Sequence, residues 1–392
     1  MNKTKAVIFA SIALSGLATS VIMPILVPLI RELRLSESQG GWMISIGSIA
    51  MAALASAWGM ASDRFGRKPV MMAGFAGLFA SYVVYTAVIW KGLAAAMTGS
   101  TLFIALVGSR ALVGGFLPAV PAGAQALMAD NTMPEERSSG MAIISAASGV
   151  GLVIGPALGG LVALRGLIWP LVLTTVLCLI ALVIVLYAVP KAPRPESIRH
   201  APVSLFTPEL FPWLAAGVLT MCSVVTIQIS AGFYFQDRLG LTTAETGPLL
   251  AIALTLVGVS LFFTQVMQVR VLRWNSHRMV LAGASCWLVA LPILLFTASM
   301  YSYFLAYVVM GAGAGLLMPG YMSGASLAVP ADRQGAVAGF STATQGIGGI
   351  VAPIASTTLY EVDKSLPFWA ILLLMCLLIA LFGLPINTQK PS

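Results

Sequence analysis

Charged side chains are scarce in this sequence. Asp, Glu, Lys and Arg make up only 9% of the 392 residues, whereas 59% of the residues are hydrophobic. Soluble domains carry about 25% charged residues, so this chain has too little polar surface to cover its apolar side chains in water. The scarcity of charge excludes a water-soluble fold and predicts a protein of the lipid bilayer.

Cysteine and histidine are scarce too, with four and two residues. The cysteines all fall inside apolar runs without C-x-x-C spacing, and both histidines lie in short charged loops. We therefore expect no disulfide framework, no metal site and no cofactor. The sequence also lacks the motifs H-E-x-x-H, G-x-S-x-G and G-x-x-x-x-G-K-[ST], which argues against an enzyme and against nucleotide binding.

Long charge-free runs occupy most of the chain. About 20 apolar residues are needed to cross a bilayer as a helix. One long run, 279–331, requires a hairpin near residues 297–303, and another, 98–129, is interrupted only by Arg110. We predict an all-α membrane protein of twelve transmembrane helices. The predicted spans are 6–30, 41–61, 69–90, 98–129, 138–164, 166–190, 210–236, 246–269, two within 279–331, 334–360 and 365–389.

Lys and Arg residues are distributed unequally over the loops. With the N-terminus inside, 14 of the 21 fall in inside segments and six in outside loops, and Arg110 lies within a span. This positive-inside bias predicts a multi-pass protein of a bacterial-type inner membrane with both termini in the cytoplasm. It accounts for the net charge of +8 without nucleic acid as a partner. Nothing in the sequence requires an oligomer, so we expect a monomer.

The chain divides into two related halves. The Pro-rich, basic stretch at 190–209 separates residues 1–189 from residues 210–392, each with six predicted spans. ERSSGMAIISAASGVGLVIGP, which ends at Pro156, is echoed by DRQGAVAGFSTATQGIGGIVAP, which ends at Pro353. Such a duplication is typical of secondary transporters, and it predicts two pseudo-symmetric six-helix bundles joined by a cytoplasmic linker.

One dense group of charges interrupts the apolar runs, in the stretch GMASDRFGRKP at residues 59–69. It resembles the loop signature that joins the second and third helices in the major facilitator superfamily. RALVG at 110–114 resembles the superfamily's fourth-helix motif, and GLVIGPALGG at 151–160 resembles the fifth-helix motif of its proton-driven drug exporters. With its twelve predicted spans and duplicated halves, the chain is similar to the twelve-helix drug/proton antiporter group.

The resemblance assigns roles to the loop signature. In the superfamily, the Asp of this loop latches the two halves on the cytoplasmic side while the cavity is open outward, and this role falls on Asp63. Its expected partner is the start of the eleventh helix, near Gln334, because a carboxylate satisfies free N–H groups there. A loop that only follows the positive-inside rule is the alternative for Arg67 and Lys68. The expected gating latch comprises Gly59, Asp63, Arg64, Gly66, Arg67 and Lys68.

Arg110 is the charged residue in the middle of a predicted span. An intramembrane charge is costly and usually faces a cavity or a partner, and its helical neighbours Gly114 and Pro118 suit a helix that lines a cavity. The resemblance assigns Arg110 to substrate binding or proton coupling, and Asp130 is a candidate proton carrier. The alternatives are an arginine bonded to helix carbonyls and a solvated helix cap at Asp130.

Acidic residues are absent from the middle of every predicted span, since all thirteen lie in loops or at span ends. Arg110 therefore lacks an evident counter-charge, and we expect a positive cavity that prefers anionic, zwitterionic or neutral amphiphiles over permanent cations. Polar and aromatic residues within the spans are candidates for the cavity lining, with packing between helices as the alternative. These candidates are Met23, Gln125, Gln228, Tyr234, Phe235, Tyr321 and Gln345.

Glycine recurs at every fourth position of the fifth predicted span. Small residues at this spacing share one helix face and permit close packing in lipid, and the proline among them bends the helix. The resemblance implies that this helix seals the cavity of an exporter against leak. The residues of this antiporter motif are Gly151, Gly155, Pro156, Gly159 and Gly160.

Taken together, these features predict a secondary active exporter of small amphiphilic molecules. It would work by alternating access, with antiport of protons, and its partners would be a small-molecule substrate, protons and the lipid bilayer. Two alternatives remain open on the same fold: export of one specific metabolite, such as a metal-chelating siderophore-like compound, and import of a nutrient.

Overall fold

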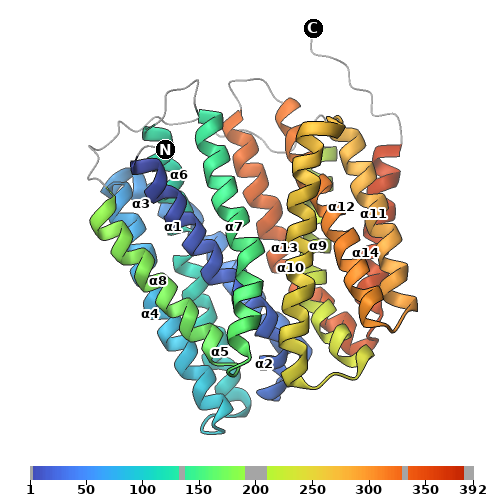
Figure 1. Ribbon diagram of the computed structural model, residues 1–392. Helices are drawn as coiled ribbons and strands as arrows, with labels where there is room; N and C mark the ends of the chain where they lie inside the picture. The colour runs from blue at the N-terminus through green and yellow to red at the C-terminus, as the bar shows by residue number, and fades with distance from the viewer. Residues whose placement is uncertain (1–2, 132–136, 190–209, 329–333, 384–392) are drawn as a thin grey trace. The chain divides into compact units, whose positions relative to one another are not determined.

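The computed structural model describes residues 3–131, 137–189, 210–328 and 334–383 (Figure 1). Every regular element in these ranges is a helix, which confirms the predicted all-α class. The first half of the chain forms α1 (Lys3–Ser20), η1 (Met23–Ile25), α2 (Leu26–Glu32), α3 (Glu37–Phe65), α4 (Arg67–Leu93), α5 (Gly99–Phe116), α6 (Ala119–Asp130), α7 (Arg137–Ala163) and α8 (Trp169–Ala188). The second half forms α9 (Phe211–Leu239), α10 (Thr243–Met267), η3 (Gln268–Leu272), α11 (Ser276–Phe296), α12 (Met300–Leu327), α13 (Gln334–Val362) and α14 (Leu366–Gly383).

Eleven segments of the described chain are long and apolar enough to cross a membrane. Two of them, Thr4–Glu32 and Gly99–Met128, contain a break in the helix. Prolines account for both breaks, because Pro24 and Pro118 lack the backbone N–H that a continuous helix requires. The helix α13, with 29 residues, occupies the place of the remaining predicted span. It is rich in glycine, serine and threonine.

Local signals set several helix boundaries. At the start of α3, the Ser36 hydroxyl accepts from the Gln39 backbone N–H (3.2 Å). The Gln39 side chain accepts in return from the Ser36 backbone N–H (3.0 Å), which completes a capping box. Residues 297–299 separate α11 from α12, so the hairpin predicted within 279–331 is confirmed.

The helices form two compact units. Unit 1 contains α1 to α8 together with residues 242–255, which include the first half of α10. Unit 2 contains α9, the rest of α10 and α11 to α14. The units differ from the proposed halves in the placement of 242–255, and the expected linker 190–209 lies outside the described residues.

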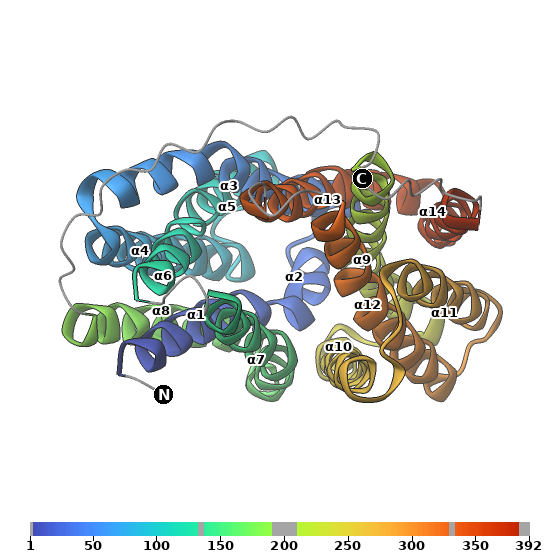
Figure 2. The same cartoon turned by 90° about the horizontal axis from the view of Figure 1, so that it is seen from above.

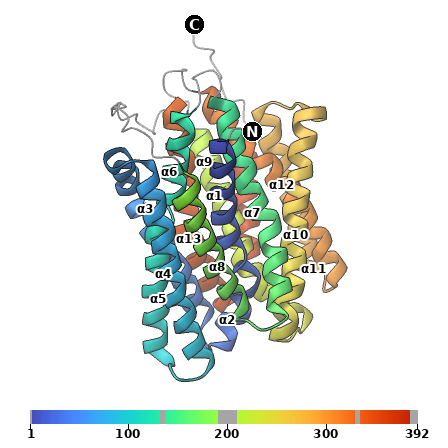
Figure 3. The ribbon, with the colours of Figure 1, turned by 60° about the vertical axis from the view of Figure 1, so that its left-hand side comes forward.

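Within unit 1, α1 packs against α6, α7 and α8, while α4 packs against α5, α6 and α8 (Figure 2). The α3–α4 junction and the end of α6 lie at one end of this unit. The α4–α5 and α7–α8 connections lie at the opposite end (Figure 3). The two ends carry different groups of polar residues, which are described below.

Within unit 2, α11 packs against α12, and α9 packs against α13. The indole Nε1 of Trp287 on α11 donates to the backbone carbonyl of Met310 on α12 (3.0 Å). Because both residues are buried, this bond satisfies an indole that has no access to water.

Candidate functional site

The turn between α3 and α4 depends on a single glycine. α3 ends at Phe65 and α4 begins at Arg67, so Gly66 alone reverses the chain. Its φ of 97° and ψ of 161° lie in a region that is open essentially only to glycine. Gly59 differs, since no atom lies within 4 Å of the position that a Cβ would take there. Gly59 therefore has no close neighbour within the described chain.

Arg67 is the centre of a charge network at this turn. Its side chain is only 8% exposed. The guanidinium donates from Nη1 to Asp63 Oδ1 and to Ser62 Oγ, and from Nε to Asp130 Oδ2 (2.9 Å). A buried arginine is tolerated only when paired and hydrogen-bonded, and these partners meet that requirement. The network joins the end of α3, the start of α4 and the end of α6.

The structure thus brings Asp130 into the predicted latch. Asp130 is the last residue of α6, whereas Arg110 lies 20 residues earlier in the same span, which corresponds to about 30 Å along a helix. Asp63 keeps 59% of its side chain exposed, against 27% for Asp130. Asp63 therefore retains an open carboxylate surface, whereas Asp130 serves mainly to hold Arg67.

Two further bases of the loop signature have different surroundings. Lys68 donates from Nζ to the backbone carbonyl of Val189 (2.8 Å), the C-cap of α8. This bond satisfies a carbonyl that the end of a helix leaves free. Arg64 is exposed, with its guanidinium 5.4 Å from the ring centre of Phe65. Sequence reasoning did not identify Val189, because it lies 121 residues from Lys68.

Arg110 lies where α3 and α5 touch. A Cβ on Gly114 would overlap the Gly47 carbonyl, and a Cβ on Gly47 would come within 3.3 Å of Arg110 Cγ. The guanidinium carbon lies 5.8 Å from the ring centre of Tyr85 on α4, which is within cation–π range. An aromatic ring and glycine backbone therefore lie against this arginine.

Among the described residues, no carboxylate forms an ion pair with Arg110. The ion pairs between described residues involve Arg31, Arg67 and Lys364, and none of them involves Arg110. Its side chain is neither fully buried nor fully exposed. Within the described chain, Arg110 is thus a positive charge in mid-span without an acidic partner.

The glycine motif of α7 packs directly against the first span. A Cβ on Gly151 would lie 2.6 Å from the backbone of Gly16, and Cβ atoms on Gly155 and Gly159 would overlap Ser20 and the Val21 carbonyl. These three glycines therefore form the contact face between α7 and α1. Gly160 faces a different neighbour, Ala251 of α10, which belongs to the same unit.

The candidates for the cavity lining fall into two groups. Tyr234, Phe235 and Tyr321 are 4%, 0% and 1% exposed. Tyr234 packs 4.5 Å from the Phe368 ring and Phe235 packs 5.6 Å from the Tyr303 ring, by ring centres. These side chains belong to the packed interior of unit 2. The more accessible candidates are Met23, Gln125, Gln228 and Gln345.

A polar cluster at the end of α9 was not foreseen from the sequence. Asp237 is 11% exposed and accepts from the Tyr360 hydroxyl (2.8 Å) and from Lys364 Nζ (3.1 Å). By its position at the end of a predicted span, Asp237 is a candidate proton carrier, with a solvated helix cap as the alternative. Its partners lie more than 120 residues away on α13 and after it, and no local pattern connects them. The cluster ties α9 to the end of α13.

Comparisons with known proteins cover nearly the whole chain. The family model of the Major Facilitator Superfamily matches residues 8–353. The class C tetracycline resistance protein of Escherichia coli is 26% identical over 379 residues, which cover 93% of this chain and 91% of that protein. Multidrug resistance protein 1 of Bacillus subtilis (strain 168) is 24% identical over 376 residues, which cover 94% of this chain and 92% of that protein.

Solved structures share the fold. A bacterial homologue of the human lysosomal transporter Spinster, in an inward-facing and occupied conformation, has a TM-score of 0.74 at 13% identity, with 97% of this chain and 95% of that chain covered. The human organic anion transporter MFSD10 has a TM-score of 0.68 at 18% identity, with 97% and 99% covered. The predicted fold and the predicted family are both confirmed. The chain is a multi-pass membrane transporter of small molecules, not an enzyme, and it belongs to the Major Facilitator Superfamily.

Proposed function

We propose that this transporter exports small amphiphilic molecules across a bacterial-type inner membrane, in exchange for protons. The observation that carries the proposal is whole-chain similarity to proteins named for resistance to tetracycline and to multiple drugs. Resistance by a membrane transporter requires that the drug leave the cell. The glycine face that packs α7 against α1 restricts leak past this helix pair, and the resemblance to the fifth-helix motif assigns such a seal to exporters.

The charge in the middle of the first unit supports a substrate preference. Arg110 lies beside Tyr85 and has no acidic partner in the described chain. A permanent cation near this charge would be repelled, and a low-dielectric surrounding strengthens the repulsion. Anionic, zwitterionic and neutral amphiphiles are therefore the favoured substrates.

The Arg67 network supports gating at the α3–α4 turn. Protonation of Asp63 or Asp130 would remove one of two carboxylates from a buried guanidinium and so weaken a junction of three helices. In this scheme the exposed carboxylate of Asp63 acts as the gating latch. Entry of protons and release of the gate are then linked through the same two carboxylates.

Purified protein in liposomes with an acidic lumen tests the proposal. Proton exit should drive accumulation of tetracycline and of an anionic fluorescent amphiphile, and a protonophore should abolish it. Arg110→Gln should lose this accumulation, whereas Arg34→Gln, a matched change at an exposed arginine outside the span interiors, should retain it.

Two results would contradict the proposal. Accumulation of a quaternary ammonium dye that is unchanged in Arg110→Gln would assign Arg110 a structural role and refute the substrate preference. If substrate moved in the same direction as protons, the protein would be a symporter. This result would refute proton-driven export and favour nutrient import.

A further inference from the structure

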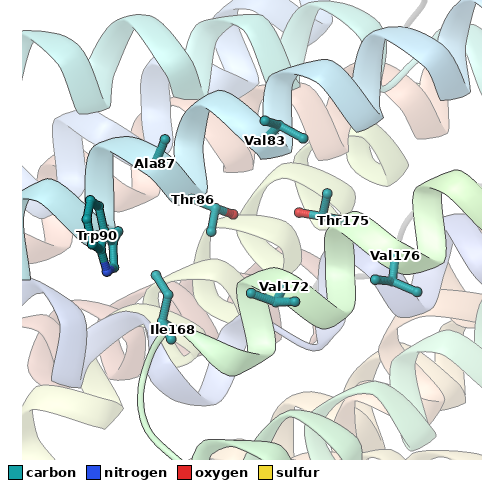
Figure 4. A pocket seen from close by; sticks show the side chains of 8 residues that line it. All are labelled: Val83, Thr86, Ala87, Trp90, Ile168, Val172, Thr175 and Val176. Carbon is teal, nitrogen blue, oxygen red and sulfur yellow. The ribbon is translucent and has the colours of Figure 1, made fainter.

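A groove on the surface of unit 1 runs between α4 and α8. Its volume is about 380 Å³, and it is lined almost entirely by apolar side chains (Figure 4). Both helices are membrane spans, and Val83 and Val176 at its rim are 45% and 43% exposed. A groove in this position faces hydrocarbon. Its lining residues are Val83, Thr86, Ala87, Trp90, Ile168, Val172, Thr175 and Val176.

Two hydroxyl groups face each other across the groove. Figure 4 shows the oxygen atoms of Thr86 and Thr175 directed toward one another from opposite walls. Thr175 donates to the Leu171 carbonyl of its own helix (2.9 Å). The Thr86 hydroxyl is buried and has no hydrogen-bond partner within the described chain. An unsatisfied buried hydroxyl is destabilising, so this donor favours an occupant that carries an acceptor.

One end of the groove lies at a polar boundary. Trp90 and Ile168 lie together at this end (Figure 4), and Trp90 is 61% exposed. Tryptophan is enriched at the level of the lipid headgroups. Thr86 precedes Trp90 by one helical turn, about 6 Å along α4. Thr86 therefore lies deeper in the membrane than Trp90, at the level of the ester carbonyls of a phospholipid whose headgroup lies beside Trp90.

Two cations flank this same end. Lys91 follows Trp90, and Arg165 precedes Ile168 by three residues in the α7–α8 connection. Both side chains are exposed, and neither takes part in an ion pair between described residues. Lys91 and Arg165 both lie in loops that the positive-inside rule predicts to be outside, where the sequence has few Lys and Arg residues. Two unpaired cations beside an apolar groove are complementary to an anionic headgroup with an acyl chain.

We propose that the groove between α4 and α8 binds one anionic phospholipid. An acyl chain lies between the two helices, an ester carbonyl accepts from the Thr86 hydroxyl, and the phosphate group lies near Lys91 and Arg165. The site is remote in sequence from the Arg67 network, at the opposite end of α4. It depends on membrane insertion alone and is independent of transport direction.

Native mass spectrometry of the full chain in detergent tests the charge of the site. The protein is titrated with phosphatidylglycerol and, in parallel, with phosphatidylcholine of identical acyl chains, and the affinity for the first lipid is measured. Phosphatidylglycerol should bind more tightly. A cation near a lipid phosphate is worth about fivefold in affinity, so Lys91→Gln and Arg165→Gln should each weaken phosphatidylglycerol binding roughly fivefold. Arg278→Gln, a matched change at an exposed arginine of unit 2, should leave it unchanged.

A second pair of variants tests the groove itself. Val83 lines the groove, and its neighbour Val84 does not, although both are 45% exposed. Val83→Phe should fill the groove and abolish tight binding of the first lipid, whereas Val84→Phe should retain it. Equal affinity for both lipids in all variants would overturn the proposal. A dimer that Val83→Phe dissociates would overturn it as well and would make the groove a contact between two copies of the chain.

Discussion

Removal of carboxylates from Arg67 should destabilise the protein in a non-additive way. Arg67 is almost fully buried and has two acidic partners, of which Asp130 is the less exposed. A hydrogen bond to a charged group is worth about 1.5–3 kcal/mol, and partial exposure of Asp130 reduces this, so we expect Asp130→Asn to cost roughly 1–2 kcal/mol. Asp63 is mostly exposed, and Asp63→Asn should cost at most about 1 kcal/mol.

The double variant Asp63→Asn/Asp130→Asn should cost more than the sum of the two single variants. It leaves a buried guanidinium without any counter-charge, a change that costs about 3–5 kcal/mol. In a unit of this size, 1 kcal/mol corresponds to roughly 2–4 °C in melting temperature. We therefore expect decreases of about 2–8 °C for Asp130→Asn, less for Asp63→Asn, and roughly 6–20 °C for the double variant.

The assay is thermal unfolding of the purified protein in detergent. It is followed by the reaction of the buried cysteine Cys178 with a thiol-reactive dye, in a background in which the other three cysteines are replaced by alanine. Addition of Arg67→Met to the double variant serves as the control, because it removes the unpaired charge and should recover part of the lost melting temperature. Additive decreases, or no recovery with Arg67→Met, would refute the view that pairing of a buried charge holds this junction together.

Three further predictions use the same assay. Gly66→Ala should cost about 1–3 kcal/mol because its backbone conformation is open essentially only to glycine, whereas Gly59→Ala, with free space around it, should cost nothing; equal effects would contradict this. Gly159→Ala should destabilise by about 1–3 kcal/mol through overlap with α1, while Gly149→Ala, which has no neighbour within 4 Å, should be neutral. Asp237→Asn should cost about 1–2 kcal/mol, because a largely buried acceptor of two hydrogen-bond donors loses its charge; an unchanged melting temperature would restore the reading of a solvated cap.

The helices could be predicted from the sequence because membrane spans are recorded in local composition. Charge-free runs indicated the transmembrane helices. The run 279–331 is too long for one transmembrane helix, so a turn within it could be predicted. The breaks at Pro24 and Pro118 follow from proline chemistry, although each span was predicted as a single helix.

The partners of the polar residues could not be predicted in the same way. Arg67 and Asp130 are 63 residues apart, and Lys68 and Val189 are 121 apart. No periodicity connects such positions, because the pairing depends on how α4 packs against α6 and α8. The sequence could not decide the role of Tyr234 either. Aromatic residues occur both in ligand sites and in packed interiors, so the residue type alone does not distinguish the two.

The bond from Lys68 to Val189 has a mechanical consequence. Val189 is the C-cap of α8, so this end of α8 is fastened to the first turn of α4. Arg67 is the residue before Lys68. A displacement of the end of α8 would therefore pull directly on the turn that holds the charge network.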